Sequence, residues 1–212
     1  MAALDLQEQE QLEALKAWWK DNRNYILAGV LIATVAMGGW RGWQYYQDKQ
    51  SGDAARLYAE FTRQLGSKDA KRINDAAAAI TGKFASSSYA SRASLLAAQA
   101  NEQGKDMTQA RSHLQWVIDH AGEAGLKAVA QLRLASLMLD EKNHAEAMKL
   151  LEAEHPASFD GLYADLRGDV LSAQGKNEEA GRAYQMAIDK TDARSMYRSL
   201  IQIKVDALVA GK

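Results

Sequence analysis

One uncharged stretch near the amino terminus constrains this chain more than any other feature. Residues 24–40 carry no charge, Arg41 interrupts once, and residues 42–47 are again uncharged. At about 1.5 Å per residue, a helix over residues 24–47 is long enough to cross the roughly 30 Å hydrocarbon core of a bilayer. Arg41 lies near the end of the stretch, where its long side chain can reach the headgroups. The stretch therefore predicts a membrane-spanning helix.

Aromatic residues at both ends of the stretch support this prediction, because such rings concentrate at headgroup depth. They are Trp18, Trp19 and Tyr25 at one end and Trp40, Trp43, Tyr45 and Tyr46 at the other. The preceding residues are mostly acidic and no clear small-residue cleavage site follows, which disfavours a cleaved signal peptide. We expect an uncleaved anchor preceded by a short amphipathic leader over residues 1–23.

The charges at the two ends do not decide the orientation of the predicted span. Three basic residues precede it and three follow it, namely Lys16, Lys20 and Arg23 before it and Arg41, Lys49 and Arg56 after it. Only the first group is packed closely against the apolar run, and long domains translocate largely regardless of charge. This pattern favours a cytoplasmic amino terminus.

Small residues recur within the span at a spacing of four. The pairs are Gly29 with Ala33 and Gly38 with Gly42. Small residues at this spacing let two helix backbones approach closely in lipid. They are also common in any membrane helix, so the pattern leaves open both a partner helix and no partner.

The overall composition predicts an all-α chain. The 212 residues include one proline and no cysteine, and the net charge is -1. No disulfide framework or cysteine-based site is possible, and no basic surface favours nucleic acid. Residues 48–212 suffice for one domain with its own core.

This domain contains three repeated helix pairs. An alanine opens the second helix of each, at Ala110, Ala147 and Ala180, spaced by 37 and 33 residues. Twelve residues before each of these alanines is a small residue, namely Ala98, Ala135 and Gly168. Four residues after each is a bulky one, namely Leu114, Leu151 and Tyr184. Closely packed antiparallel helices need a small side chain at the crossing and a large one beside it. The period is near that of tetratricopeptide repeats.

The end of the domain predicts a capping helix over residues 192–208. Met196, Leu200, Ile203 and Ala207 recur at helical spacing and are expected to face the open end of the stack. The predicted fold is therefore all-α: one transmembrane helix, then an α-solenoid of tetratricopeptide-like pairs with a C-terminal cap.

Two stretches resemble a known family. Residues 126–152 read LKAVAQLRLASLMLDEKNHAEAMKLLE and residues 163–188 read YADLRGDVLSAQGKNEEAGRAYQMAI, of which residues 164–169 are the most specific part. Together with the anchor they resemble the YfgM family of inner-membrane proteins. The resemblance implies a cytoplasmic amino terminus, a periplasmic repeat domain, and association with the SecYEG translocon and a membrane-anchored chaperone of the PpiD type.

Polar residues of the repeats are candidates for contact with a partner. A groove formed by stacked pairs is expected to carry Gln131, Arg133, Asp165, Arg167 and Asp169. Asp165 and Asp169, four apart, also invite a reading as paired catalytic carboxylates. No nucleophile, histidine base or glycine-rich loop accompanies them, so a structural role or partner contact is favoured.

No other motif indicates an enzyme, a metal or a cofactor. His113 and His120 share a helix face, but no third ligand lies at useful spacing. The sequence predicts a non-enzymatic inner-membrane adaptor that binds periplasmic chaperones or emerging polypeptides, without a small-molecule substrate. The alternative is an envelope scaffold for another membrane assembly.

Overall fold

The computed structural model describes residues 2–67 and 69–210, and every regular element in these residues is helical. The all-α prediction is confirmed. Contacts divide the chain into two units, Met1–Ser51 and Gly52–Lys212. Each unit is described by itself.

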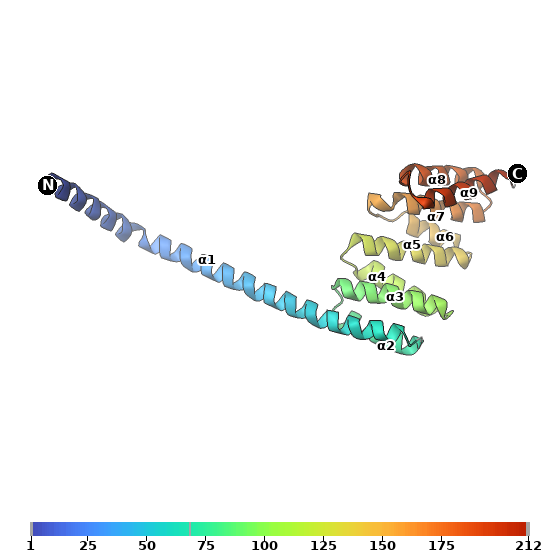
Figure 1. Cartoon of the computed structure of the whole chain (residues 1–212), viewed down its shortest axis with the longest axis horizontal. Helices are drawn as coiled ribbons and strands as arrows, with labels where there is room; N and C mark the ends of the chain where they lie inside the picture. Colours follow the sequence, from blue (N-terminus) through green and yellow to red (C-terminus); the bar gives the residue numbers. More distant parts are fainter. Residues whose placement is uncertain (1, 68, 211–212) are drawn as a thin grey trace. The chain divides into compact units, whose positions relative to one another are not determined.

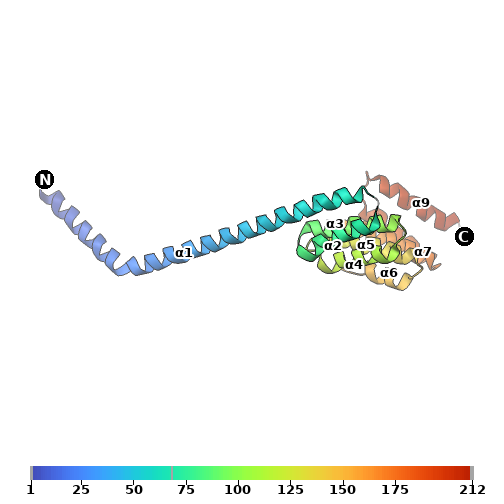
Figure 2. The same ribbon diagram turned by 90° about the horizontal axis from the view of Figure 1, so that it is seen from below.

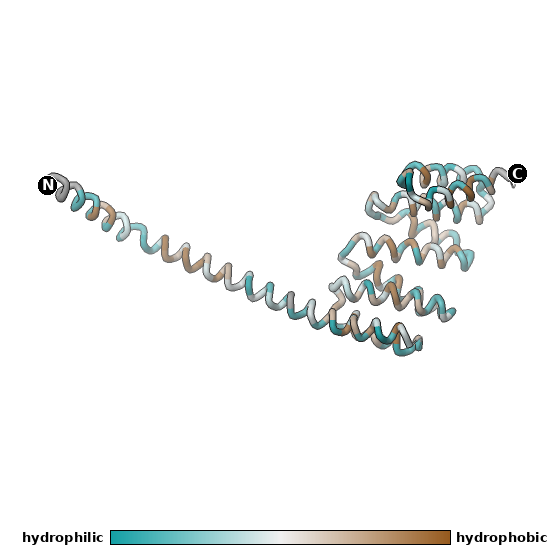
Figure 3. Tube along the Cα trace, in the orientation of Figure 1, coloured by the Kyte–Doolittle hydropathy of each residue, from teal (hydrophilic) through white to brown (hydrophobic). Residues whose placement is uncertain are grey.

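The first unit consists of most of one long helix, α1 (Ala2–Leu65), which continues into the second unit. No proline occurs before Pro156, so the helix runs through the apolar stretch without a break. Figure 3 colours the apolar segment of α1 mostly in neutral to hydrophobic shades. Leu31, Ile32 and Val35 keep about two thirds of their surface exposed, at 65%, 69% and 66%. Among the described residues, α1 alone is long and apolar enough to cross a membrane.

The second unit is a stack of helices that follow one another in chain order (Figures 1 and 2). After α1 come α2 (Ala70–Lys83), α3 (Ser88–Gln103), α4 (Met107–His120), α5 (Ala124–Asp140), α6 (His144–Leu151), the short 3-10 turn η1 (Ala157–Phe159), α7 (Asp160–Ala173), α8 (Asn177–Lys190) and α9 (Met196–Ala210). The pairs α3–α4, α5–α6 and α7–α8 are the three predicted repeats.

The turn inside each repeat has the same backbone conformation. Lys105, Lys142 and Gly175 have φ angles of 64°, 61° and 75°. They are 37 and 33 residues apart, which is the spacing of the repeats. Only Gly175 adopts this left-handed conformation without steric cost. The turn geometry therefore belongs to the repeat rather than to a particular residue.

The second helices of the first two repeats begin with side-chain caps. Asp106 accepts a hydrogen bond from the backbone N–H of Gln109 at 3.0 Å, and Asn143 accepts one from that of Glu146 at 3.4 Å. Each cap satisfies one of the free N–H groups of a helix start. In the third repeat the equivalent residue, Lys176, makes no side-chain cap.

The core of the second unit is continuous with α1 at one end and α9 at the other. Phe61 near the end of α1 is fully buried with Ile73 and Ile80 of α2. Alanines fill half of the buried apolar positions from α3 onward, which lets the helices approach closely. At the far end Ile201 of α9 is fully buried against α7 and α8.

Helix α9 caps the stack, but not through the predicted face. Met196, Leu200 and Ile203 are 87%, 56% and 63% exposed, and Ala207 is also exposed. The face that packs consists of Tyr197, Ile201, Lys204, Val205 and Leu208. The predicted face is wrong because α7 presents two carboxylates to α9, and only the face with Lys204 and Tyr197 provides partners for them.

Candidate functional site

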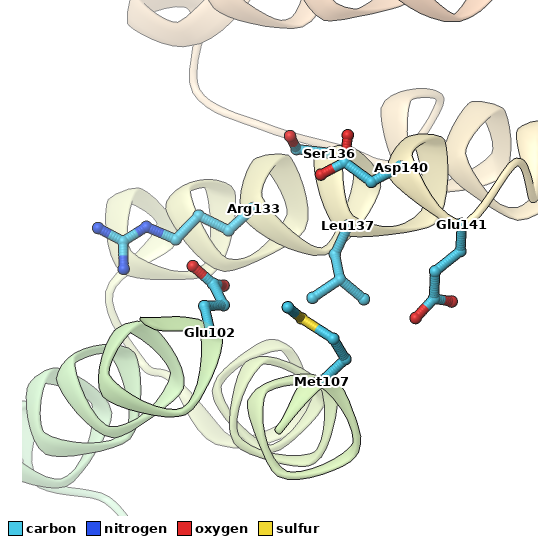
Figure 4. Close-up of a pocket in the computed structure, with 7 residues that line it drawn as sticks. All are labelled: Glu102, Met107, Arg133, Ser136, Leu137, Asp140 and Glu141. Carbon is cyan, nitrogen blue, oxygen red and sulfur yellow. The ribbon is translucent and has the colours of Figure 1, made fainter. Parts of the chain in front are cut away.

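A hollow in the second unit lies between α3, α4 and α5 (Figure 4). Its volume is about 300 Å³. It is lined by Glu102 from α3, Met107 from α4, Arg133, Ser136, Leu137 and Asp140 from α5, and Glu141 at the end of α5. We call it the Met107 pocket. Figure 4 shows the side chains of Met107 and Leu137 next to one another, with Glu102 to one side and Glu141 to the other.

The first repeat turn positions two of these side chains. The end of α3 at Gln103 and the start of α4 at Met107 are joined through Lys105, whose left-handed backbone reverses the chain. Glu102 and Met107 therefore come from opposite sides of one tight turn. Helix α5 packs on both α3 and α4 and supplies the other wall.

Two charged residues of the pocket already have partners. Glu141 forms an ion pair with Arg111 of α4, whose Nη2 donates to both carboxylate oxygens. The Arg133 guanidinium donates a hydrogen bond from Nη1 to the carbonyl oxygen of Leu95 at 3.2 Å. These contacts tie α5 to the helix pair before it, because Arg111 and Leu95 both belong to that pair.

The other two carboxylates make no ion pair within the part of the chain that the structure describes. They are Glu102, which is half-buried, and Asp140, which is exposed. Burial raises the pKa of Glu102, Arg133 opposes the rise, and the negative charge of Asp140 adds to it. The pocket thus combines an apolar floor with two carboxylates that form no ion pair among the described residues, although the charge of Arg133 acts on Glu102.

Of the predicted groove residues, Arg133 lines the Met107 pocket and Gln131 does not. Gln131 is 3% exposed, and its side-chain oxygen accepts a hydrogen bond from the Tyr163 hydroxyl at 2.7 Å. This contact joins α5 to α7. Burial raises the pKa of Tyr163 to about 12, so the phenol is neutral at physiological pH.

Asp165 and Asp169 lie together under α9. Lys204 Nζ donates to both, at 2.8 Å from Asp165 Oδ2 and 2.8 Å from Asp169 Oδ2. The hydroxyl of Tyr197 donates to Asp165, and that of Tyr184 to Asp169 at 2.8 Å. We call these five residues the Lys204 cluster. Every carboxylate has partners, so the cluster fastens the capping helix rather than presenting a reactive pair.

The pKa directions in the Lys204 cluster agree with this role. Burial disfavours the charge of Lys204, but the hydrogen bonds that it donates to Asp165 and Asp169, together with the negative charges of these carboxylates, outweigh burial and raise the pKa of Lys204 above its ordinary value of 10.5. Burial, followed by the bonds to the carboxylates, raises the pKa of both Tyr184 and Tyr197. At neutral pH the lysine is therefore charged and both phenols are protonated.

Arg167 points to the second repeat rather than to a groove. Its Nη2 donates to the carbonyl oxygen of Leu151 at 2.9 Å, which links α7 to the end of α6. Of the five predicted groove residues, the structure thus brings Asp165 and Asp169 together and places Arg133 alone at the Met107 pocket.

The structure buries all the residues predicted at the repeat crossings. These are Ala98, Ala110, Leu114, Ala135, Ala147, Leu151, Gly168, Ala180 and Tyr184. Gly168 is tightly packed, because a Cβ atom there would overlap the ring of Tyr184. No larger residue fits at this position while the ring stays in place.

The small residues of the first unit have a different environment. A Cβ atom at Gly29, Gly38 or Gly42 would meet nothing within 4 Å, and Ala33 is exposed. Ala33, Gly38 and Arg41 lie along a shallow hollow on one side of α1.

Metal-ligand geometry is missing from the described residues: no three His, Asp or Glu side chains lie close enough to share an ion. His113 pairs with Asn74 at 3.0 Å, whereas His120 stacks on Trp116 with ring centroids 4.6 Å apart. The two histidines therefore have separate local partners.

Sequence reasoning missed the residues that complete both sites. Glu102, Met107 and Asp140 meet only because the turn and α5 bring them together, and Lys204 lies 39 residues after Asp165. One signal was available: Lys204 stands between Ile203 and Val205, and a lysine on an apolar side of a helix requires a carboxylate partner when it is buried.

Comparison with known proteins gives relatives along nearly the whole chain. A protein of Neisseria gonorrhoeae named ancillary SecYEG translocon subunit is 29% identical over 97% of this chain and 99% of its own. Proteins of the same name from Aggregatibacter actinomycetemcomitans and Escherichia coli are each 28% identical, over 97% and 95% of this chain and 100% and 96% of their own. No solved structure matches the chain significantly.

The family comparison covers the same region. The family model described as tetratricopeptide repeat-like domain matches residues 16–210, which include the apolar segment of α1 as well as the helix pairs. The predicted repeat architecture and the resemblance to translocon accessory proteins are confirmed by these matches. The chain belongs to the tetratricopeptide repeat-like domain family that matches residues 16–210.

Proposed function

We propose that this protein is a non-enzymatic ancillary subunit of the SecYEG translocon, held in the inner membrane. The observation that carries this proposal is the match to relatives of that name over almost the full length of both chains. An apolar helix and a repeat domain on one chain suit this role, because the helix supplies an anchor and the repeats supply a protein-binding surface.

The proposed topology follows the sequence. Residues 1–23 form a cytoplasmic leader, residues 24–47 cross the membrane, and residues 48–212 lie in the periplasm. The basic residues immediately before the apolar stretch, Lys16, Lys20 and Arg23, favour this orientation. Residues on the lipid-facing surface of a span need no protein contact, in keeping with the exposure of Leu31 and Ile32.

The span is the proposed contact with the membrane part of the translocon. Gly29, Ala33, Gly38 and Gly42 leave the backbone of α1 uncovered, since a Cβ atom at each of the three glycines would meet nothing. Such a surface suits close packing against another membrane helix.

The repeat domain is the proposed contact with chaperones, including a membrane-anchored one of the PpiD type, and with emerging polypeptides. Arg133 and the Met107 pocket supply the exposed part of the predicted groove, whereas Gln131 and Asp165 act inside the stack. Anchoring near the translocon raises the effective concentration of the domain, so weak contacts are sufficient.

Site-specific photocrosslinking tests this function in cells. A photoreactive phenylalanine analogue is placed at Met107 or Ser136 in the pocket and, as matched controls, at the exposed positions Lys71 and Glu179. We expect the pocket probes to trap periplasmic chaperones or nascent chains, and a probe at Gly38 in the span to trap a translocon subunit. The proposal fails if the controls trap such proteins while the pocket and span probes trap none.

Protease treatment of spheroplasts tests the topology separately. Digestion of the repeat domain in intact spheroplasts is the expected result, since the domain then lies outside the inner membrane. Protection until lysis would place it in the cytoplasm and overturn the orientation.

A further inference from the structure

The Met107 pocket has an apolar floor that is open to a ligand. Met107 is 38% exposed even though it is a large hydrophobic side chain, and it lies against Leu137. Exposed apolar surface inside a hollow costs free energy that an apolar ligand group recovers on binding. The floor therefore favours a ligand with a hydrocarbon part.

The rim of the pocket favours a positive charge. Glu102 and Asp140 approach it from two different helices, and neither has an ion-pair partner among the described residues. Glu102 is half-buried, so its charge is costly unless a cation or hydrogen-bond donor reaches it.

The basic residues nearby fill this need only in part: the charge of Arg133 lowers the pKa of Glu102 against the effect of burial, but the two side chains form no ion pair among the described residues. Arg111 is held by Glu141, and the Arg133 guanidinium is bonded to the Leu95 carbonyl. An anion is disfavoured because it would meet two unpaired carboxylates. A bound metal ion is disfavoured because the described residues offer no group of three suitable ligands.

Lysine and arginine side chains combine the two features that the pocket requires. Each has an aliphatic stem that packs along apolar surface and a cationic end that reaches carboxylates. We propose that the Met107 pocket receives the side chain of a lysine or arginine from a bound polypeptide, with the stem over Met107 and Leu137 and the cation between Glu102 and Asp140. This inference rests on the proposed function, in which the repeat domain binds polypeptides.

Two matched peptides test the inference on the full chain in detergent micelles. Both are fluorescent twelve-residue peptides of leucine, alanine and serine, with either lysine or norleucine at the centre. We expect the lysine peptide to bind about tenfold more tightly by fluorescence anisotropy, the size of one well-placed charge contact, and the preference to shrink as salt is raised.

Isosteric variants assign the preference to the pocket. In the double variant Glu102→Gln with Asp140→Asn, the affinity for the lysine peptide is expected to fall to that for the norleucine peptide. The affinity for the norleucine peptide is expected to stay unchanged. The control is Glu178→Gln with Glu179→Gln, which removes two exposed carboxylates of α8 and is expected to keep the tenfold preference. Circular dichroism checks that each variant is folded.

A charge exchange gives an independent readout. Glu102→Lys should favour a peptide with central glutamate over the lysine peptide. Equal binding of the lysine and norleucine peptides, a preference that survives the pocket substitutions, or no binding of the lysine peptide overturns the inference. None of these results would contradict the translocon role if the photocrosslinks to chaperones, nascent chains or a translocon subunit are obtained. The two proposals can therefore fail independently.

Discussion

The apolar residues of the first unit and those of the repeat domain have the same chemistry but opposite surroundings. Ile32 in α1 is 69% exposed, whereas Ile80 in α2 is fully buried. Gly38 has open space around it, whereas Gly168 lies against the ring of Tyr184. The difference teaches that residue type alone does not fix a side chain's contribution to stability. In the second unit it depends on neighbouring helices, and in the first unit it depends on the surrounding medium.

The same glycine substitution in the two regions should give the largest contrast. Gly168→Leu forces four carbons into space that the Tyr184 ring occupies, and this ring is held by its bond to Asp169. We expect a loss of about 4 kcal/mol in the free energy of unfolding, seen as a fall of roughly 10 °C in Tm. Thermal unfolding of the full chain in detergent, followed by circular dichroism, measures it.

Gly38→Leu is the matched control and should leave that transition unchanged, because nothing surrounds Gly38 within 4 Å. Equal effects of the two substitutions would contradict the contrast between the regions.

An isoleucine pair gives the next contrast. Ile80→Ala removes three buried carbons from the first part of the core and should cost about 3 kcal/mol of stability. Ile32→Ala removes the same carbons from an exposed position in α1 and should leave the unfolding of the repeat domain unchanged. Urea unfolding of both variants measures the denaturation midpoints. An unchanged midpoint in Ile80→Ala would contradict the packing of Ile80 in the core of the second unit.

A tyrosine pair gives the smallest contrast and makes it depend on pH. Tyr163→Phe removes the hydrogen bond to Gln131 and should cost about 1 kcal/mol at pH 7. Tyr45→Phe alters an exposed ring of α1 and should cost nothing measurable in the same assay.

The pH dependence follows from the raised pKa of Tyr163. Burial raises it to about 12, above the ordinary value of 10.0, so the folded state holds the phenol proton more tightly than the unfolded state. The corresponding stability is fully present below pH 10 and is lost as pH rises from 10 to 12. The free energy of unfolding of Tyr163→Phe should therefore fall less steeply between pH 10 and pH 12 than that of the unsubstituted protein. Urea titrations at a series of pH values measure this slope. Part of the slope should remain, because burial also raises the pKa of Tyr184 and Tyr197.

Much of the fold was open to prediction because its signals are local. The caps at Asp106 and Asn143 act within three residues, and the small and large residues of each repeat recur at fixed spacing. Gly168 and Tyr184 could be recognised as a packed pair from this recurrence alone. The family match over residues 16–210 adds that the apolar segment and the repeats occur together in relatives.

The candidate sites were harder to predict because they depend on contacts between distant residues. Asp165 and Asp169 were recognised, but their partner Lys204 comes from a helix more than 30 residues later. Likewise, the Met107 pocket needs the end of α3, the start of α4 and the end of α5 at one place. No spacing in the sequence predicts that these three helix ends lie together.

Helix α9 separates what the sequence determines from what the tertiary structure decides. The sequence alone determined that this segment is a helix, since helical periodicity is a local property. It offered two faces with similar periodicity, one through Leu200 and Ile203 and one through Ile201 and Lys204. Only the tertiary structure selected the second face, because Asp165 and Asp169 of α7 pair with the cation and hydroxyl that this face carries. Asp165 is buried, and leaving a buried carboxylate unpaired costs free energy.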